Sequence, residues 1–149
     1  MGLIQELTNK TVFLDTAPLI YYIEENYKYL QVLEKLFSEN SKEKFLFQTS
    51  VITLIEVLIY PMRQKEYQLV KKYQNILCNS PTIDIFEINA EIAISAAQYR
   101  ARYGLKTPDS IQVASAVNAN SDFFLTNDIE LKSIKEIKIL ILDEIIKRS

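Results

Sequence analysis

Hydrophobic positions along the chain fall into two kinds of run, short apolar runs typical of strands and longer runs with helical spacing. Strands are expected where β-branched and aromatic residues are concentrated, at 11–14, 44–49, 82–88, 123–125 and 137–142. Helices are expected where apolar residues recur three or four positions apart, at 16–25, 27–38, 51–60, 63–77, 90–103, from 107 onward and at 129–133. Strands that alternate with helix-length segments need crossover connections. The pattern therefore predicts an α/β fold with a mostly parallel sheet and helices on both faces.

Two of the expected helices have clear boundary signals. Thr107 is a good N-cap, Pro108 suits the first helical position, and Asp109 then lies in the first turn, where a carboxylate meets the positive end of the helix dipole. Ser50 is expected to cap the helix that follows the second strand, and Pro61 is expected to end that helix. The sequence thus places an acid, Asp109, at a helix start.

The length and composition favour one domain. The chain has 149 residues, 48% of them hydrophobic, and only two Gly and four Pro, which leaves no obvious flexible linker. We expect a single domain, residues 1–149, with a leader at 1–10, a core at 11–142 and a C-terminal tail at 143–149. The single cysteine, Cys78, and the lack of a signal peptide or a long apolar run favour a cytoplasmic protein that does not enter a membrane.

The charge balance restricts the kind of chemistry. The chain has 17 basic and 19 acidic side chains and a net charge of −2, so any surface that binds phosphate must be local. Histidine is absent, which excludes imidazole ligands, histidine general bases and Ser-His or Cys-His nucleophile pairs. A catalytic site in this chain must therefore use carboxylates, hydroxyls or a metal ion.

Four acids have an unusual setting. Asp15 and Asp128 each come directly or shortly after an expected strand, Asp109 lies in a first helical turn, and Glu56 lies in an apolar helix with no basic residue three or four positions away. Lone buried carboxylates are costly, and several in one cleft repel one another unless a divalent cation lies among them. Hard oxygen ligands suit Mg²⁺ or Mn²⁺. The conjunction of the four predicts a metal site.

Each of the four acids also has a purely structural interpretation. Asp15 and Asp109 could only cap helices, Glu56 could reach solvent at a helix edge, and Asp128 could belong to an ordinary Asn-Asp turn. For each acid considered alone, the structural interpretation is stronger than the functional one or about as strong. The remaining acids with similar local settings are assigned to turns or to surface charge, namely Asp84, Asp122, Asp143 and Glu144.

A basic segment with interspersed tyrosines begins at Arg63. Such a mixture can hold a single-stranded backbone and stack bases, although most helices of this composition are only solvated faces. Three further cations come shortly before Asp109 and could hold phosphate beside an acidic cleft. The candidate RNA-binding residues are Arg63, Lys65, Lys71, Lys72, Arg100, Arg102 and Lys106.

Three blocks of sequence carry a family resemblance. FLDTAPLIYYIE, TSVITLIEVL and GLKTPDSIQVASAVNANSDFFLTND resemble, in order and spacing, the PIN-domain ribonucleases and especially the VapC-like toxins. The resemblance spans about residues 12–142. It implies a three-layer α/β/α sandwich with a central mostly parallel sheet, an acidic pocket at the carboxyl ends of the strands, and cleavage of RNA that depends on Mg²⁺ or Mn²⁺.

The resemblance also assigns roles. Asp15, Glu56, Asp109 and Asp128 correspond to the four acids of the family, as catalytic residues and metal ligands, and Thr126 corresponds to its hydroxyl beside the last acid. A toxin of this kind implies an RNA substrate, a small antitoxin partner and a homodimer. Two positions depart from the family pattern, since Gln112 stands where many relatives have His and Ser110 where Ala is usual. Neither is a ligand position.

Two other functions compete with this one. An aspartyl-phosphate mechanism with Asp15 as nucleophile is disfavoured, because Ala17 stands where such phosphatases have a second aspartate. A non-catalytic PIN-like module that binds RNA or protein is the alternative, and retention of all four acids disfavours it.

Overall fold

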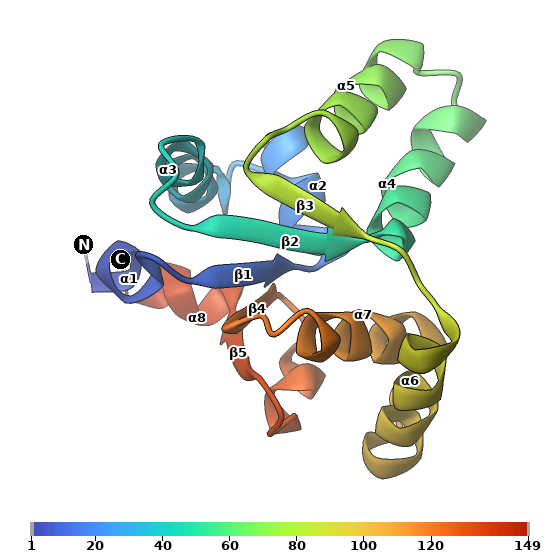
Figure 1. Ribbon diagram of the computed structural model, residues 1–149. Coiled ribbons are helices and arrows are strands. Elements are labelled where there is room, and N and C mark those ends of the chain that lie inside the picture. The colour runs from blue at the N-terminus through green and yellow to red at the C-terminus, as the bar shows by residue number, and fades with distance from the viewer. Residues whose placement is uncertain (1, 149) are drawn as a thin grey trace.

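The computed structural model describes residues 2–148 and has a parallel five-stranded sheet at its centre (Figure 1). The strand order is β3-β2-β1-β4-β5, and every neighbouring pair is parallel. The strands are β1 (Thr11–Leu14), β2 (Leu46–Ser50), β3 (Ile83–Phe86), β4 (Phe123–Thr126) and β5 (Lys138–Ile141). All five expected strands are therefore present, each shifted or shortened by at most a few residues.

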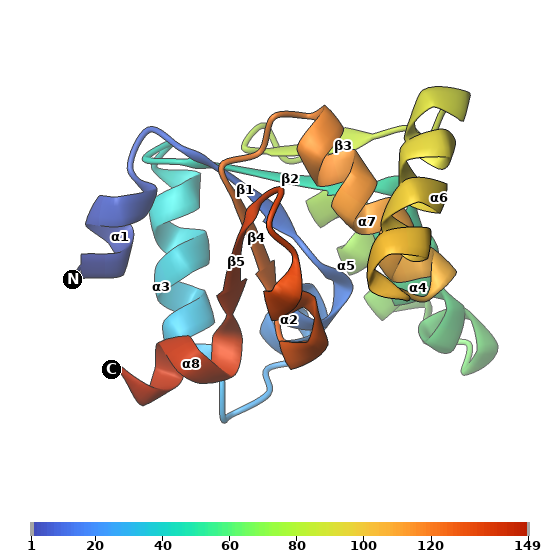
Figure 2. The ribbon, with the colours of Figure 1, turned by 90° about the horizontal axis from the view of Figure 1, so that it is seen from below.

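Helices cover both faces of this sheet (Figures 1 and 2). They are α1 (Gly2–Leu7), α2 (Thr16–Ile23), α3 (Leu30–Ser41), α4 (Val51–Arg63), α5 (Tyr67–Cys78), α6 (Ala90–Tyr103), α7 (Thr107–Asn118), the 3₁₀ helix η1 (Ile129–Ser133) and α8 (Leu142–Lys147). Because side chains alternate along a strand, β1 sends Val12 and Leu14 into the core shared with α1 to α5 and α8, and Phe13 into the core shared with α6, α7 and η1. The predicted three-layer α/β/α sandwich is confirmed.

The strand order reverses at β1. The chain moves outward from β1 to β2 and β3 and then returns to the other side of β1 to form β4 and β5. The helices that follow β1 and β2 pack on one face, and those that follow β3 pack on the other. In open α/β sheets, the segments leaving two such strands diverge and leave room for a ligand beyond their carboxyl ends. The fold therefore directs attention to the residues just after β1 and β4.

Several expected helix boundaries are wrong, and the helix expected at 27–38 is α3, which runs from Leu30 to Ser41. Pro61 does not end α4, which continues to Arg63; the buried proline lies within the last turn, where its missing N–H removes one intrahelical hydrogen bond. Helix α5 begins at Tyr67 rather than at residue 63, after a turn in which Lys65 has a positive φ of 57°. Thr107 is already helical, and Lys106 is the N-cap of α7, without a side-chain cap hydrogen bond.

The two ends of the described chain pack on the same core. Ile4 and Leu7 of α1, and Leu142 and Ile145 of α8, are buried with the side chains of α3 and β1. The leader and tail expected from the sequence thus contain helices. The division 1–149 into one domain stays a prediction, and its two terminal residues, Met1 and Ser149, lie outside the described residues. Within residues 2–148, none of the helices has the length and apolar character needed to cross a membrane.

Candidate active site

Asp15 lies directly after β1, at the point where the strand order reverses. Its Oδ1 accepts a hydrogen bond of 2.8 Å from the backbone N–H of Thr16, so the side chain caps α2. Its Oδ2 accepts a second hydrogen bond of 2.8 Å from the hydroxyl of Thr126. The capping interpretation therefore holds, and the same carboxylate also contacts the end of β4, 111 residues away in the sequence.

Thr126 connects two of the predicted site residues. Its hydroxyl donates to Asp15 and accepts a hydrogen bond of 3.1 Å from the backbone N–H of Asp128. Asp128 in turn caps η1, because its Oδ1 accepts from the backbone N–H of Glu130 at 3.0 Å. The Thr-Asn-Asp segment that begins with the last residue of β4 is thus fixed against the end of β1 by the buried hydroxyl of Thr126.

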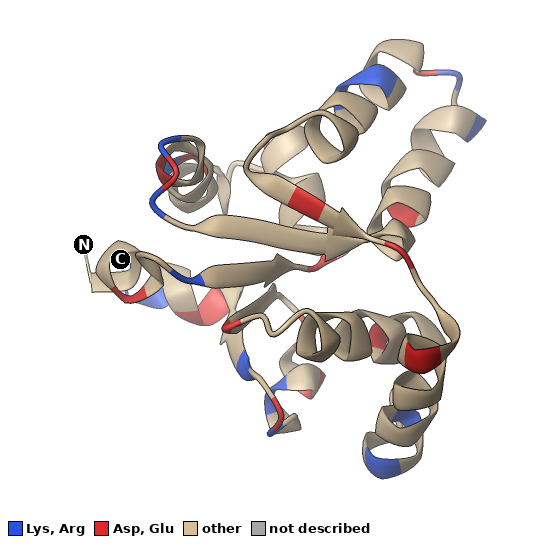
Figure 3. Ribbon diagram, viewed as in Figure 1, with Lys and Arg blue, Asp and Glu red and all other residues tan. Residues whose placement is uncertain are grey.

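Glu56 reaches the site from α4. Its Oε1 accepts a hydrogen bond of 2.7 Å from the hydroxyl of Thr16, the residue after Asp15. The side chain is exposed, as the structural interpretation of this residue anticipated. Glu56 can be exposed to solvent and still contact Thr16, because it lies on the edge of α4 that faces the start of α2. Figure 3 shows acidic positions at the end of β1, on α4 and on α7.

The acids interact electrostatically. Burial raises the pKa of Asp15 to about 6 from 3.8; hydrogen bonds from Thr126 and Thr16 oppose this, and the negative charges of Asp109 and Glu56 add to it. Burial also raises the pKa of Asp109, as do the charges of Asp128 and Glu56, against the opposing effect of Lys106. The structure therefore brings the four predicted acids into one electrostatic group, centred on Asp15 and Asp109.

The donor chemistry of this group fits a hard divalent cation, while its geometry is not compact. All the side-chain donors are carboxylate or hydroxyl oxygens, the ligands that Mg²⁺ and Mn²⁺ prefer, and their mutual repulsion favours a cation among them. Within residues 2–148, however, no three Asp, Glu, His or Cys side chains stand close enough together to hold a metal ion. A compact ligand set would need movement of these side chains.

Behind the acids lies a buried polar cluster that the sequence analysis missed. Its members are Thr49, Ser50, Thr53 and Gln112, each at most 1% exposed. Thr53 precedes Glu56 by three positions and Gln112 follows Asp109 by three, so each polar residue shares a helix face with an acid. Polar residues three positions from an acid within an apolar helix were the sequence signal that could have revealed this cluster.

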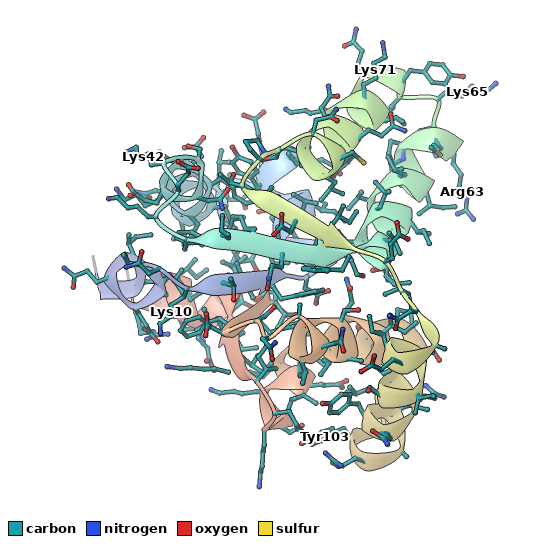
Figure 4. The ribbon with its side chains drawn as sticks, viewed as in Figure 1. Lys10, Lys42, Arg63, Lys65, Lys71 and Tyr103 are labelled. Carbon is teal, nitrogen blue, oxygen red and sulfur yellow. The ribbon has the colours of Figure 1, made fainter. Side chains whose placement is uncertain are left out.

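The basic segment at the end of α4 lies far out on the molecule. Arg63, Lys65 and Lys71 extend from the outer end of the pair formed by α4 and α5 (Figure 4), and Lys72 is exposed on α5. Tyr60 and Tyr67, 58% and 68% exposed, lie near these cations. The arrangement leaves the cations and aromatic rings open to solvent on one projecting part of the fold.

The three cations before Asp109 have separate surroundings. Arg100 donates a hydrogen bond of 2.7 Å to the backbone carbonyl of Leu105, and Arg102 forms an ion pair with Glu136. Lys106 lowers the pKa of Asp109 and so acts on the acids. Arg100 and Arg102 are thus occupied in local structure.

Comparison with protein families matches residues 12–137 to the PIN domain. A comparison with curated proteins found no match. Solved structures with a similar fold include VapBC2 from Rickettsia felis bound to a DNA fragment from its promoter, with a TM-score of 0.72, 16% sequence identity, and coverage of 88% of this chain and 98% of that chain.

Two further structures are similar. DNA-bound VapBC from Salmonella typhimurium has a TM-score of 0.69 and 18% identity, over 89% of this chain and 98% of that chain. VapC20 from Mycobacterium tuberculosis, described as a toxin that cleaves the sarcin-ricin loop, has a TM-score of 0.67 and 14% identity, over 85% of this chain and 98% of that chain. At these identities the likeness is one of fold.

Proposed function

We propose, from the premise that this chain belongs to the PIN domain family, that it is a ribonuclease that hydrolyses phosphodiester bonds with the help of Mg²⁺ or Mn²⁺. One observation carries the proposal. Asp15, which follows β1, caps α2 with one oxygen and accepts from Thr126 at the end of β4 with the other, and its pKa is raised to about 6 by burial and by the nearby charges of Asp109 and Glu56. Such a set of mutually repelling carboxylates gains most from a cation.

In this proposal, Asp15 and Asp109 hold the cation most directly, and Glu56 and Asp128 complete the site. The cation would supply a lowered pKa of the attacking water and stabilisation of charge on the phosphate. Thr126 orients the carboxylate of Asp15 through its hydroxyl. Thr16 does the same for Glu56 and, through its backbone N–H, for Asp15.

The substrate class and partner belong to the same proposal. Exposed cations and tyrosines at the outer end of α4 and α5 support binding of single-stranded RNA, with Arg63, Lys65, Lys71 and Lys72 on phosphate. Lys106 lies beside the acids, where it can contact the substrate backbone. Several similar structures are toxin-antitoxin complexes, which supports a small antitoxin protein as partner. A homodimer belongs to the proposal through the family resemblance alone.

The test is cleavage of RNA with and without Mg²⁺ by the unmutated chain, Asp15→Asn and Asp109→Asn. We expect cleavage to need the cation and to fall more than about 100-fold in both variants. Changing residues that only hydrogen-bond to metal ligands already lowers metal affinity or activity by about 10–100-fold. Asp84→Asn is the matched control, because Asp84 is an exposed acid on β3. Undiminished cleavage in both site variants would remove the assignment.

The second candidate is a PIN-like module that binds RNA or protein without cutting. The absence of a compact ligand set within residues 2–148 favours it. It predicts RNA binding that is unchanged by Mn²⁺, no heat of Mn²⁺ binding in calorimetry, and no cleaved ends when cellular RNA is sequenced after expression. Cation binding together with new RNA ends would exclude this candidate.

A further inference from the structure

The buried polar cluster behind the acids forms a continuous chain of hydrogen bonds. The Oγ of Ser50 donates to Oε1 of Gln112 at 2.5 Å, and Nε2 of Gln112 donates to Oγ1 of Thr53 at 2.6 Å. The amide of Gln112 is therefore bonded through both its oxygen and its nitrogen, to the end of β2 and to α4. A buried amide bonded at both ends has its orientation fixed.

From Thr53 the chain continues to the first two strands. The hydroxyls of Thr53 and Thr49 lie 2.9 Å apart, and Thr49 donates a hydrogen bond of 2.8 Å to the carbonyl of Leu14, the residue before Asp15. The hydroxyls of Thr53 and Thr16 lie 3.4 Å apart, and Thr16 donates to Glu56. The cluster thus reaches the backbone beside Asp15 and the carboxylate of Glu56.

Gln112 supplies the hydrogen that the hydroxyls lack. A hydroxyl donates only one hydrogen bond, and Thr16 and Thr49 already donate to Glu56 and to Leu14. Thr53 has one hydrogen for its two hydroxyl neighbours, and it accepts from the amide of Gln112. Without that amide, Thr53 would lose its strongest donor in a place where water does not reach, since it is 0% exposed.

We propose that Gln112 and Thr53 are positioning residues that hold α7, which carries Asp109, against α4, which carries Glu56, and so limit how far apart the two carboxylates can lie when a cation binds. The inference rests on the proposed function. Asp109 and Gln112 are one turn apart on α7, and Thr53 and Glu56 are one turn apart on α4. The 2.6 Å contact between the two polar residues therefore sets how the two acid-bearing helix faces meet.

The test compares two substitutions of Thr53 that each remove one of its two side-chain groups. Thr53→Val keeps the shape and removes the hydroxyl, whereas Thr53→Ser keeps the hydroxyl and removes the methyl group. We expect Thr53→Val to weaken the binding of Mn²⁺ alone by about 10-fold in calorimetry, and Thr53→Ser to recover most of the affinity. RNA cleavage should follow the same order. A residue that only packs would give the opposite order.

Gln112→Leu provides a second variant, and Ser115→Ala the control. Gln112→Leu removes both amide contacts and should weaken Mn²⁺ binding like Thr53→Val. Ser115 is 1% exposed on the same helix, α7, and its hydroxyl has no hydrogen-bond partner within the part of the chain that the structure describes. Its removal should leave Mn²⁺ affinity unchanged. If Gln112→Leu does not fold, the comparison of Thr53→Val with Thr53→Ser still tests the positioning role.

The outcomes separate the two proposals. If the unmutated chain binds Mn²⁺ and cleaves RNA, and Thr53→Val binds Mn²⁺ as tightly as Thr53→Ser, the positioning role is overturned while the ribonuclease proposal stands. If the unmutated chain neither binds Mn²⁺ nor cleaves RNA, the proposed function fails and the positioning role fails with it.

Discussion

Two carboxylates at opposite ends of the sheet have pKa values displaced in opposite directions. Asp15 follows β1 at the carboxyl end of the sheet, and burial raises its pKa to about 6. Glu39 lies near the end of α3, close to the start of β2, and the ammonium groups of Lys44 and Lys35 hold its pKa at about 2, below its usual 4.5. The ionised form of a carboxyl group is thus destabilised at Asp15, at the carboxyl end of the sheet, and stabilised at Glu39, at the opposite end.

The difference lies in the neighbours. The side chain of Glu39 is 3% exposed, and its oxygens lie 2.6 Å from Lys44, 3.0 Å from Lys35 and 3.5 Å from Lys42. Lys42 projects from the side of the molecule opposite Arg63 (Figure 4). The charges of two acids, Asp109 and Glu56, add to the raised pKa of Asp15. Nearby lysines thus compensate the negative charge of Glu39, whereas the neighbouring charges of Asp109 and Glu56 add to the cost of ionising Asp15.

The largest effect on stability is expected from removing the charge of Asp15. An acid whose pKa is about 6 in the fold and 3.8 unfolded opposes folding at pH 7 by up to about 3 kcal/mol, and the loss develops as the pH rises through that window. Without divalent cations, Asp15→Asn should therefore raise the free energy of unfolding in urea. Asp84→Asn should change it by less than about 0.5 kcal/mol. If Asp15→Asn instead lowers the free energy of unfolding, the ionised carboxylate of Asp15 does not oppose folding and its contrast with Glu39 is lost.

Added cation should offset most of that difference in stability. A ligand at one hundred times its dissociation constant stabilises the fold that binds it by about 2.7 kcal/mol. We expect Mn²⁺ to stabilise the unmutated chain by this amount and to leave Asp15→Asn unchanged, as measured by urea unfolding at matched ionic strength. Equal stabilisation of both proteins would mean that the ion binds elsewhere.

At the other end of the sheet, acid should reveal the contribution of Glu39. Because its pKa is lowered in the fold, its stabilisation is fully present above pH 4.5 and is lost as the pH falls to about 2. Glu39→Gln should therefore be less stable than the unmutated chain at pH 7, and the difference should vanish near pH 2. Glu34→Gln, which replaces an exposed acid on the same helix, is the matched control. Urea unfolding across this pH range measures both.

The smallest expected effect separates the lysines around Glu39. Lys44 lies 2.6 Å from the carboxylate and Lys42 lies 3.5 Å from it, and both are largely exposed. Solvent screens such pairs, so each contributes little. Lys44→Met should still move the acid unfolding midpoint further than Lys42→Met. An equal shift from both would show that the summed charge, rather than the close pair, holds the pKa of Glu39 down.

The sequence by itself determined the elements and their class. Period-two and period-3.6 patterns are local properties, so the five strands, the helices between them and the parallel sheet were predictable. The placement of Asp15 and Asp128 just beyond strands followed from the same pattern, because parallel strands end at one edge. The boundaries at Pro61 and Lys106 were not predictable, since packing of a buried proline and the path into α7 override local signals.

Only the tertiary structure decided which side chains meet. Gln112 contacts Ser50 across 62 positions, and Glu39 gains Lys44 through the turn into β2, so neither partner could be chosen from the sequence. Burial sets the pKa of Asp15, and burial depends on the whole chain. A pattern records what a residue prefers, whereas contact and dielectric surroundings exist only after distant segments have packed.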